Sequence, residues 1–199
     1  MRKILLVASC LLFVIGCADA WRITPDLAKE LKEKQAAVKA RPNDPDARFD
    51  LAITMAYTNN IPDGWNNLKK TVELDPNYKQ NGLELYIKKV TENRNDWRLR
   101  FRLAFAYYFN DKKKDAIREL DNVILLEPGN VWAYGYIALI YGELGDIDLA
   151  MKYTQNGLKL DSNVAALHLL LSEGYYKKNN SWGGFLERVE ALRLKALGY

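Results

Sequence analysis

A short motif returns along this chain every 34 positions. Leu126-Glu127-Pro128-Gly129 is followed 34 residues later by Leu160-Asp161-Ser162-Asn163. Leu74-Asp75-Pro76-Asn77 precedes the first of these by 52 residues, which is one period plus an insert of 18. A fixed period of this length indicates a repeat architecture, in which no unit can bury its apolar face alone and neighbouring units must stack.

Three further kinds of position recur with the same period. An aliphatic residue followed by a small one occurs at Leu51-Ala52, Leu103-Ala104, Ile137-Ala138 and Leu171-Ser172. Residue types that favour turns occur at Asn59, Asp111, Gly145 and Asn179. A second small residue, each time followed by a large apolar one, occurs at Gly64, Ala116, Ala150 and Gly184. Because the apolar spacing on both sides of the turn is helical, each unit is predicted to be two closely packed antiparallel helices.

These columns resemble the tetratricopeptide repeat. The unit 131–164 carries Tyr134, Ile137-Ala138, Tyr141, Gly145-Asp146, Ala150 and Leu160-Asp161, and departs from the family in having Ser162 where proline is usual. The resemblance implies an all-α, right-handed superhelical solenoid of antiparallel helix pairs. Its predicted parts are a half-unit at 25–44, repeats at 45–78, 97–130 and 131–164, a degenerate repeat at 165–198, and an insert helix at 79–96. The last unit is expected to be degenerate because it must face water rather than a neighbour.

Residues 1–16 have the features of a secretory signal segment. Arg2 and Lys3 precede an apolar run from Ile4 to Ile15, which is too short to span a bilayer. Val14-Ile15-Gly16-Cys17 resembles a bacterial lipobox, which implies cleavage before Cys17 and lipidation of that residue, with 17–24 as a tether. The expected product is anchored to a membrane only by lipid and faces the periplasm or the cell surface. Two alternatives remain: cleavage after Ala20, which would release a soluble protein, and a Cys17 that is merely a small apolar residue.

Charge and composition argue against several function classes. The net charge of +4 falls to +2 without Arg2 and Lys3, which is too small to favour nucleic acid. His168 is the single histidine and is predicted to be a packing residue, and at most one cysteine follows the signal segment. A zinc site or a nucleophilic catalytic site would therefore lack ligands or orienting partners. We predict a chain that is not an enzyme and uses no cofactor or metal.

The resemblance also implies where a partner would bind. Tetratricopeptide arrays hold partners along the concave surface made by the first helix of each unit, and the corresponding positions are Phe49, Ile53, Arg98, Phe101, Arg102, Phe105, Trp132 and Leu139. These mostly apolar side chains suit an amphipathic helix or an extended apolar peptide. Two interpretations are open at this point: the side chains contact a partner, or the insert helix or the next unit covers them.

Arg94, Arg98 and Arg102 follow one another at intervals of four residues and would form a basic stripe on one helical face. Such a stripe could meet an acidic segment or a phosphate, but a solvated face is the more ordinary expectation. The predicted function is a protein-interaction module for a protein or peptide of the cell envelope. The alternative is a self-associating structural subunit, in which the groove buries a second copy of the chain.

Overall fold

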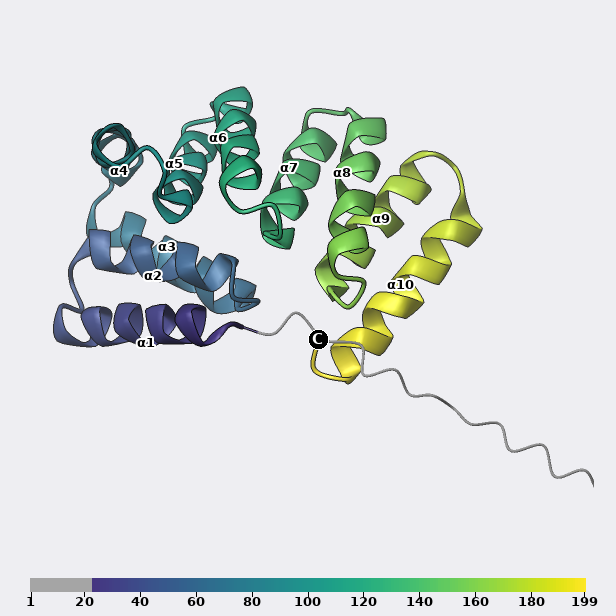
Figure 1. Cartoon of the computed structure of the whole chain (residues 1–199), viewed down its shortest axis with the longest axis horizontal. Coiled ribbons are helices and arrows are strands. Elements are labelled where there is room, and N and C mark those ends of the chain that lie inside the picture. Colours follow the sequence, from purple (N-terminus) through teal and green to yellow (C-terminus); the bar gives the residue numbers. More distant parts are fainter. Residues whose placement is uncertain (1–22) are drawn as a thin grey trace, which may run out of the picture.

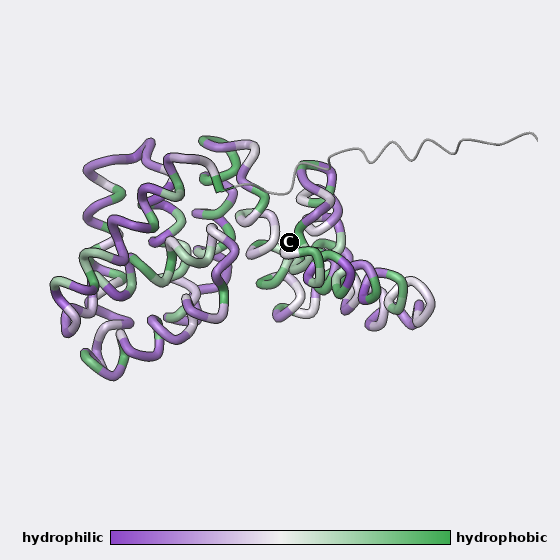
Figure 2. Tube along the Cα trace, turned by 90° about the horizontal axis from the view of Figure 1, so that it is seen from below, coloured by the Kyte–Doolittle hydropathy of each residue, from purple (hydrophilic) through white to green (hydrophobic). Residues whose placement is uncertain are grey.

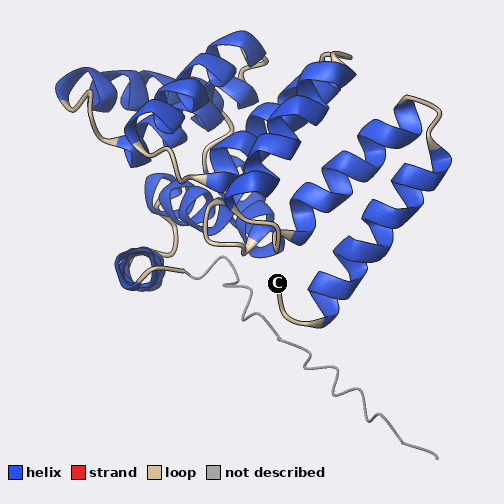
Figure 3. Cartoon of the chain, turned by 45° about the vertical axis from the view of Figure 1, so that its right-hand side comes forward, coloured by secondary structure: helices blue, strands red, loops and turns tan. Residues whose placement is uncertain are grey.

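The computed structural model describes residues 23–199, and every regular element in that range is an α-helix (Figure 1). The ten helices are α1 (Pro25–Ala40), α2 (Pro45–Ala56), α3 (Ile61–Leu74), α4 (Tyr78–Glu92), α5 (Trp97–Phe109), α6 (Lys113–Leu126), α7 (Val131–Glu143), α8 (Ile147–Leu160), α9 (Ala165–Lys177) and α10 (Ser181–Ala196). Figure 3 shows the same content from another side, with helices joined by short loops. The all-α prediction is confirmed.

Eight of these helices form four antiparallel hairpins, one in each predicted repeat. The pairs are α2 with α3, α5 with α6, α7 with α8, and α9 with α10. In Figure 2, hydrophobic and hydrophilic positions alternate along the helical traces, as expected of helices that bury one face. Helices α1 and α4 have no hairpin partner and pack instead on α2 and α5 respectively.

The turn within each hairpin depends on one residue with left-handed backbone geometry. Asn59, Asp111 and Asn179 have φ values of 59°, 57° and 59°, and Gly145 has a φ of 84°. These are the four residues of the predicted turn column. Asparagine, aspartate and glycine are the residues that adopt this conformation at least cost, which explains why the column holds no other type.

Small residues let the two helices of a hairpin approach closely, as the repeat columns predict. A Cβ atom placed on Gly64 of α3 would lie 3.0 Å from the carbonyl oxygen of Ala52 in α2. Ala116 of α6 is fully buried at the equivalent place. A larger side chain would overpack this contact, which typically costs about 1–3 kcal/mol.

The hairpins stack through contacts between the second helix of one unit and the first helix of the next. Helix α6 packs on α7, and α8 packs on α9. Helix α3 has no equivalent neighbour, because α4 touches it at only a few positions. In Figure 1, α4 is seen almost down its axis whereas α1, α2 and α3 lie across the view, so α4 crosses the preceding helices steeply. The insert therefore interrupts the regular stacking.

Within residues 23–199, none of the helices is both long enough and apolar enough to cross a lipid bilayer. The predicted signal segment and Cys17 lie outside the described residues.

The turn geometry predicts opposite effects for two nearby glycines. Gly145→Ala is expected to lower the free energy of unfolding by about 1–2 kcal/mol, because alanine is strained at positive φ. Gly142→Ala is the matched control, since Gly142 is helical and its added Cβ would come no nearer than 4.0 Å to the Ala150 Cβ. It should raise stability by about 0.5–1 kcal/mol. Urea unfolding followed by circular dichroism measures both, and equal effects would contradict the turn assignment.

Candidate functional site

An open apolar cleft lies between α3 and α4, where the regular stacking is interrupted. Its volume is about 550 Å³. Trp65, Leu68 and Val72 of α3 form one wall, and Tyr78, Gly82 and Leu83 of α4 form the other. Phe49 of α2 with Ala106 and Phe109 of α5 also line it. Clefts of this size and apolar character are where proteins usually bind ligands or partner side chains.

The cleft is open because α3 lacks the neighbour that covers other second helices. Ile117 of α6 occupies the repeat position of Trp65 and is 6% exposed, since α7 packs over it. Trp65 is 46% exposed. The repeat position of Val72 shows the same contrast: Ile124 is partly buried against the core, whereas Val72 is 41% exposed. Side chains that elsewhere hold two units together therefore face the cleft on α3.

The α4 wall is fixed to α2 by hydrogen bonds from two tyrosines. The Tyr86 hydroxyl donates to Asp50 Oδ1 at 2.6 Å, and the Tyr78 hydroxyl donates to Asp46 Oδ1 at 2.8 Å. Phe49 lies between these rings, with its centroid 5.3 Å from that of Tyr78 and 5.2 Å from that of Tyr86. This aromatic cluster sets the position of α4 and, with it, the width of the cleft.

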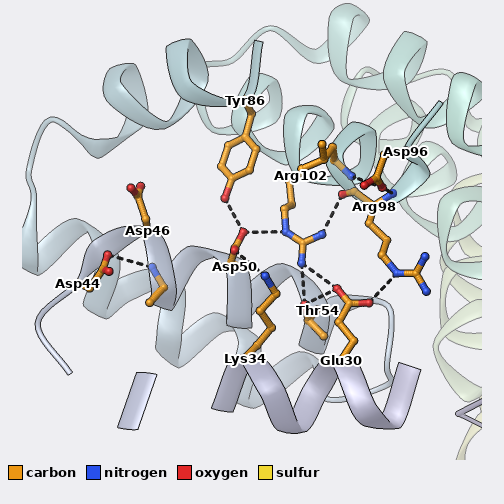
Figure 4. A network of polar contacts seen from close by, with 12 residues as sticks. Glu30, Lys34, Asp44, Asp46, Asp50, Thr54, Tyr86, Asp96, Arg98 and Arg102 are labelled. Carbon is orange, nitrogen blue, oxygen red and sulfur yellow. Dashed lines mark hydrogen bonds and ion pairs between the residues drawn. The ribbon is translucent and has the colours of Figure 1, made fainter. Parts of the chain in front are cut away.

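A buried arginine connects the same region to α1 and α2 (Figure 4). Arg102 of α5 is 2% exposed. Its Nε donates to Asp50 Oδ1 at 2.8 Å, and its Nη2 donates to Glu30 Oε1 at 3.0 Å and to Thr54 Oγ1 at 2.9 Å. Its Nη1 donates to the Arg98 carbonyl oxygen at 3.0 Å. Every nitrogen of the guanidinium therefore has an acceptor, which a buried charge requires.

The two carboxylates that pair with Arg102 have further partners. Lys34 Nζ lies 2.8 Å from Asp50 Oδ2, and Arg98 Nε lies 2.7 Å from Glu30 Oε2. Burial by itself would raise the pKa of Asp50, but Arg102, Lys34 and the Tyr86 hydroxyl together lower it to about 2. The Glu30 pKa is also lowered: burial opposes the charge, and the Tyr57 hydroxyl, Arg102 and Arg98 favour it. We call Glu30, Lys34, Asp50, Tyr86, Arg98 and Arg102 the ionic network.

Comparison with known proteins identifies the fold of this chain. No family model matches the chain, and no curated protein sequence matches it. Two solved structures of MamA do resemble it: one from MSR-1 has a TM-score of 0.58 at 15% identity and covers 86% of this chain and 95% of its own. Another from AMB-1 has a TM-score of 0.56 at 16% identity and covers 85% and 96%. The fold is a tetratricopeptide-type solenoid. At this level of identity the likeness shows the fold and nothing of the function.

The solenoid buries most of the residues predicted to line a concave groove. Phe101 of α5 and Trp132 of α7 are in the core, and so are Phe49, Ile53, Arg102 and Phe105. Arg98 and Leu139 are half-buried. Of the two interpretations left open by the sequence, internal packing describes where these side chains lie. Phe49 nevertheless reaches the cleft, and Phe105 and Leu139 line a small hollow that shares Trp65 with it.

The expectation of a solvated basic stripe is wrong. Arg94 is exposed, but Arg98 pairs with Glu30 and Arg102 lies inside the protein. The reason is that α1 and α2 pack against this face of α5 and bring Glu30 and Asp50 to it. A signal was present in the sequence: Asp50 and Arg102 stand at the same position of successive units, with opposite charges and apolar residues on both sides.

The remaining titratable side chains of residues 23–199 can be compared with metal-binding and catalytic arrangements through His, Cys, Asp and Glu. Within the described part of the chain, His, Cys, Asp and Glu form no cluster of three or more that could hold a metal ion. His168 is half-buried, with its Nδ1 2.6 Å from Glu187 Oε2 and its Nε2 2.9 Å from the Ser162 carbonyl oxygen. Nδ1 therefore joins α9 to α10 and Nε2 joins α9 to the connection that precedes it, as the packing interpretation of His168 predicts.

The ionic network predicts a loss of stability in acid. Because the pKa of Asp50 is lower in the folded state (about 2) than its ordinary value of 3.8, its contribution is present above pH 4 and disappears as the pH falls to 2. The loss should be about 2 kcal/mol. Urea unfolding at a series of pH values measures it, with Asp50→Asn as the control that lacks this part of the pH dependence. The same slope in both proteins would contradict the assignment.

Proposed function

We propose that this chain is a non-enzymatic protein-interaction module, exported and tethered to a membrane through a lipidated Cys17. Its partner is an envelope protein that places an amphipathic helix in the α3–α4 cleft. The observation that carries the proposal is the cleft itself, because apolar side chains that bind the next unit elsewhere in the solenoid are left uncovered on α3.

The partner segment is inferred to be helical from what covers the equivalent surfaces. On α6 and α8, the positions of Trp65 and Val72 are covered by the first helix of the following unit. A surface shaped to receive a helix within the chain is suited to a helix supplied by another protein. Aromatic side chains such as Trp65 and Phe109, in a cleft that a bound helix would desolvate, are typical anchors of such an interface.

The rim of the cleft favours acidic residues beside the apolar face of that helix. Lys69 and Lys79 lie at the edge of the cleft. Glu73 also lies there, but its carboxylate is 2.9 Å from Lys70 Nζ and is already neutralised. The uncompensated charge at the rim is thus positive, which would attract a helix with Asp or Glu along its flank and would repel a basic one.

A matched pair of substitutions tests this binding surface. Val72 of α3 lines the cleft and Ile87 of α4 does not, while each is 41% exposed. A photo-crosslinking residue at position 72 should capture one envelope protein in intact cells, and the same residue at position 87 should not. The captured protein's helix is then made as a peptide and titrated by calorimetry. Val72→Asp is expected to weaken binding about tenfold or more, because it places a charge in an apolar contact.

Two results would refute the cleft as the binding surface. One is equal crosslinking from positions 72 and 87, which would indicate random encounter. The other is a peptide whose affinity falls as much with Ile87→Asp as with Val72→Asp. Circular dichroism of both variants provides the folding control, since both substitutions are at exposed positions and should leave the helical content unchanged.

Tethering is tested with the two cysteines of the signal region. Cys17→Ser should move the protein from the membrane fraction to the soluble fraction, because the acyl chains that hold it to the bilayer can no longer be attached. Cys10→Ser is the matched control and should leave the protein in the membrane fraction. The result is read by fractionation and immunoblotting. If Cys17→Ser stays in the membrane fraction, lipidation of Cys17 is not what holds the protein there. A mature protein that starts after Ala20 would instead show a soluble exported form.

A further inference from the structure

Helix α10 carries a wide apolar face that no other part of residues 23–199 covers. Trp182 is 69% exposed and Leu192 is 61% exposed, and Phe185, Leu186 and Val189 between them are each about half exposed. Because these residues are three or four positions apart, they share one side of α10. The Trp182 and Phe185 rings stack with their centroids 5.7 Å apart. We call these five residues the α10 face; α10 is the outer helix at the end of the array (Figure 3).

This apolar face is wider than the one that would be exposed simply because no further repeat follows α10 in the array. Phe185 and Leu192 occupy positions that are apolar in every unit, since they contact the next unit. The other three residues of the face occupy positions that hold proline or polar residues in the other units. The position of Trp182 holds Pro62, Lys114 and Asp148, that of Leu186 holds Asn66, Arg118 and Lys152, and that of Val189 holds Lys69, Asp121 and Gln155. The terminal unit was expected to face water, yet it has large apolar residues at these three positions. Such a patch on a soluble domain marks an interaction surface.

We infer that the α10 face binds the α10 face of a second copy, which gives a two-fold symmetric dimer with the two helices antiparallel. Stacking end to end is disfavoured by the other end of the solenoid. There the exposed residues of α1 include Lys29, Lys32, Glu33 and Lys39, and the apolar ones among them, such as Ala36 and Ala40, are small, so α1 offers α10 no large apolar side chain. A self-complementary patch, in which each α10 face covers the other, produces an isologous dimer.

Charge permits this association. Two ion pairs within the same copy compensate charges beside the face: Glu190 Oε1 lies 2.5 Å from Arg193 Nη2, and Arg188 pairs with Glu173. Glu187 is hydrogen-bonded to His168. Two copies can therefore approach without strong repulsion or the burial of an unpaired charge. Stable interfaces bury about 800 Å² on each partner, and five large side chains that are about half exposed or more supply a substantial share of that area.

The position of Val189 allows a sharp test that does not depend on the cleft or on the tether. Val189 lies near the middle of the face. In an antiparallel pair it therefore lies close to Val189 of the second copy. The whole chain, with Cys10→Ser and Cys17→Ser, is studied by sedimentation velocity over a wide range of concentration. A monomer–dimer equilibrium is expected, and Val189→Asp should weaken it about tenfold or more. Val72→Asp in the cleft should leave it unchanged.

Crosslinking locates the interface. In the same cysteine-free chain, Val189→Cys should form a disulfide between copies, whereas Lys32→Cys on the exposed side of α1 should not. A monomer at every concentration would overturn the inference, and so would a dimer abolished by Val72→Asp but not by Val189→Asp. A monomer that instead co-sediments with phosphatidylethanolamine–phosphatidylglycerol vesicles, and loses this property in Val189→Asp, would show that the face contacts lipid rather than a second copy.

Discussion

The structure depends on one contact, repeated along the chain: the second helix of each hairpin must be covered by the first helix of the next. A hairpin alone leaves an apolar stripe on its second helix, and the stacking neighbour removes that stripe from water. Where the neighbour is present, as at Ile117, the side chain is buried. The contact is absent in two places among the described residues, on α3 and on α10. At both places side chains of the stacking positions are exposed: Trp65 and Val72 on α3, and Phe185 and Leu192 on α10.

Helix α4 must be held in place by contacts with helices other than α3, because it crosses α3 steeply and touches it at only a few positions. Tyr78 and Tyr86 fasten α4 to carboxylates of α2, and Arg102 joins Asp50 of α2 to Glu30 of α1. Removing one member of such a buried group leaves an uncompensated charge and typically costs about 3–5 kcal/mol. A buried ionic group need not add net stability over an apolar core, but it fixes one arrangement of the helices. Here that arrangement keeps the cleft open.

The features that repeat could be predicted from the sequence, whereas the packing of the elements that do not repeat could not. All four members of the turn column have a positive φ, since the same backbone requirement selects Asn, Asp or Gly in each unit. The direction of α4 could not be predicted, because the 18-residue insert has no counterpart from which to infer its packing. Arg102 was misjudged for a related reason: its helical spacing from Arg94 and Arg98 indicated a stripe, whereas its actual partners come from helices about 50 and 70 residues away. The groove residues illustrate a third limit, since the same aromatic side chains serve equally well as anchors for a partner and as core.

The two uncovered surfaces differ in a way that separates their roles. On α3 the uncovered side chains are those that every unit uses for stacking. The cleft is therefore an ordinary stacking surface that lacks the neighbouring helix. On α10 the apolar set extends to positions that hold proline or polar residues in the other units, so this face has been enlarged beyond the needs of stacking. The recessed cleft with a positive rim is the surface that we propose for a helix of a different protein, and the α10 face is the surface that we infer binds a second copy. If both are occupied at once, a dimer through α10 would present two clefts in a fixed relation, and a partner with two helices could then bind with an avidity that a single cleft cannot provide.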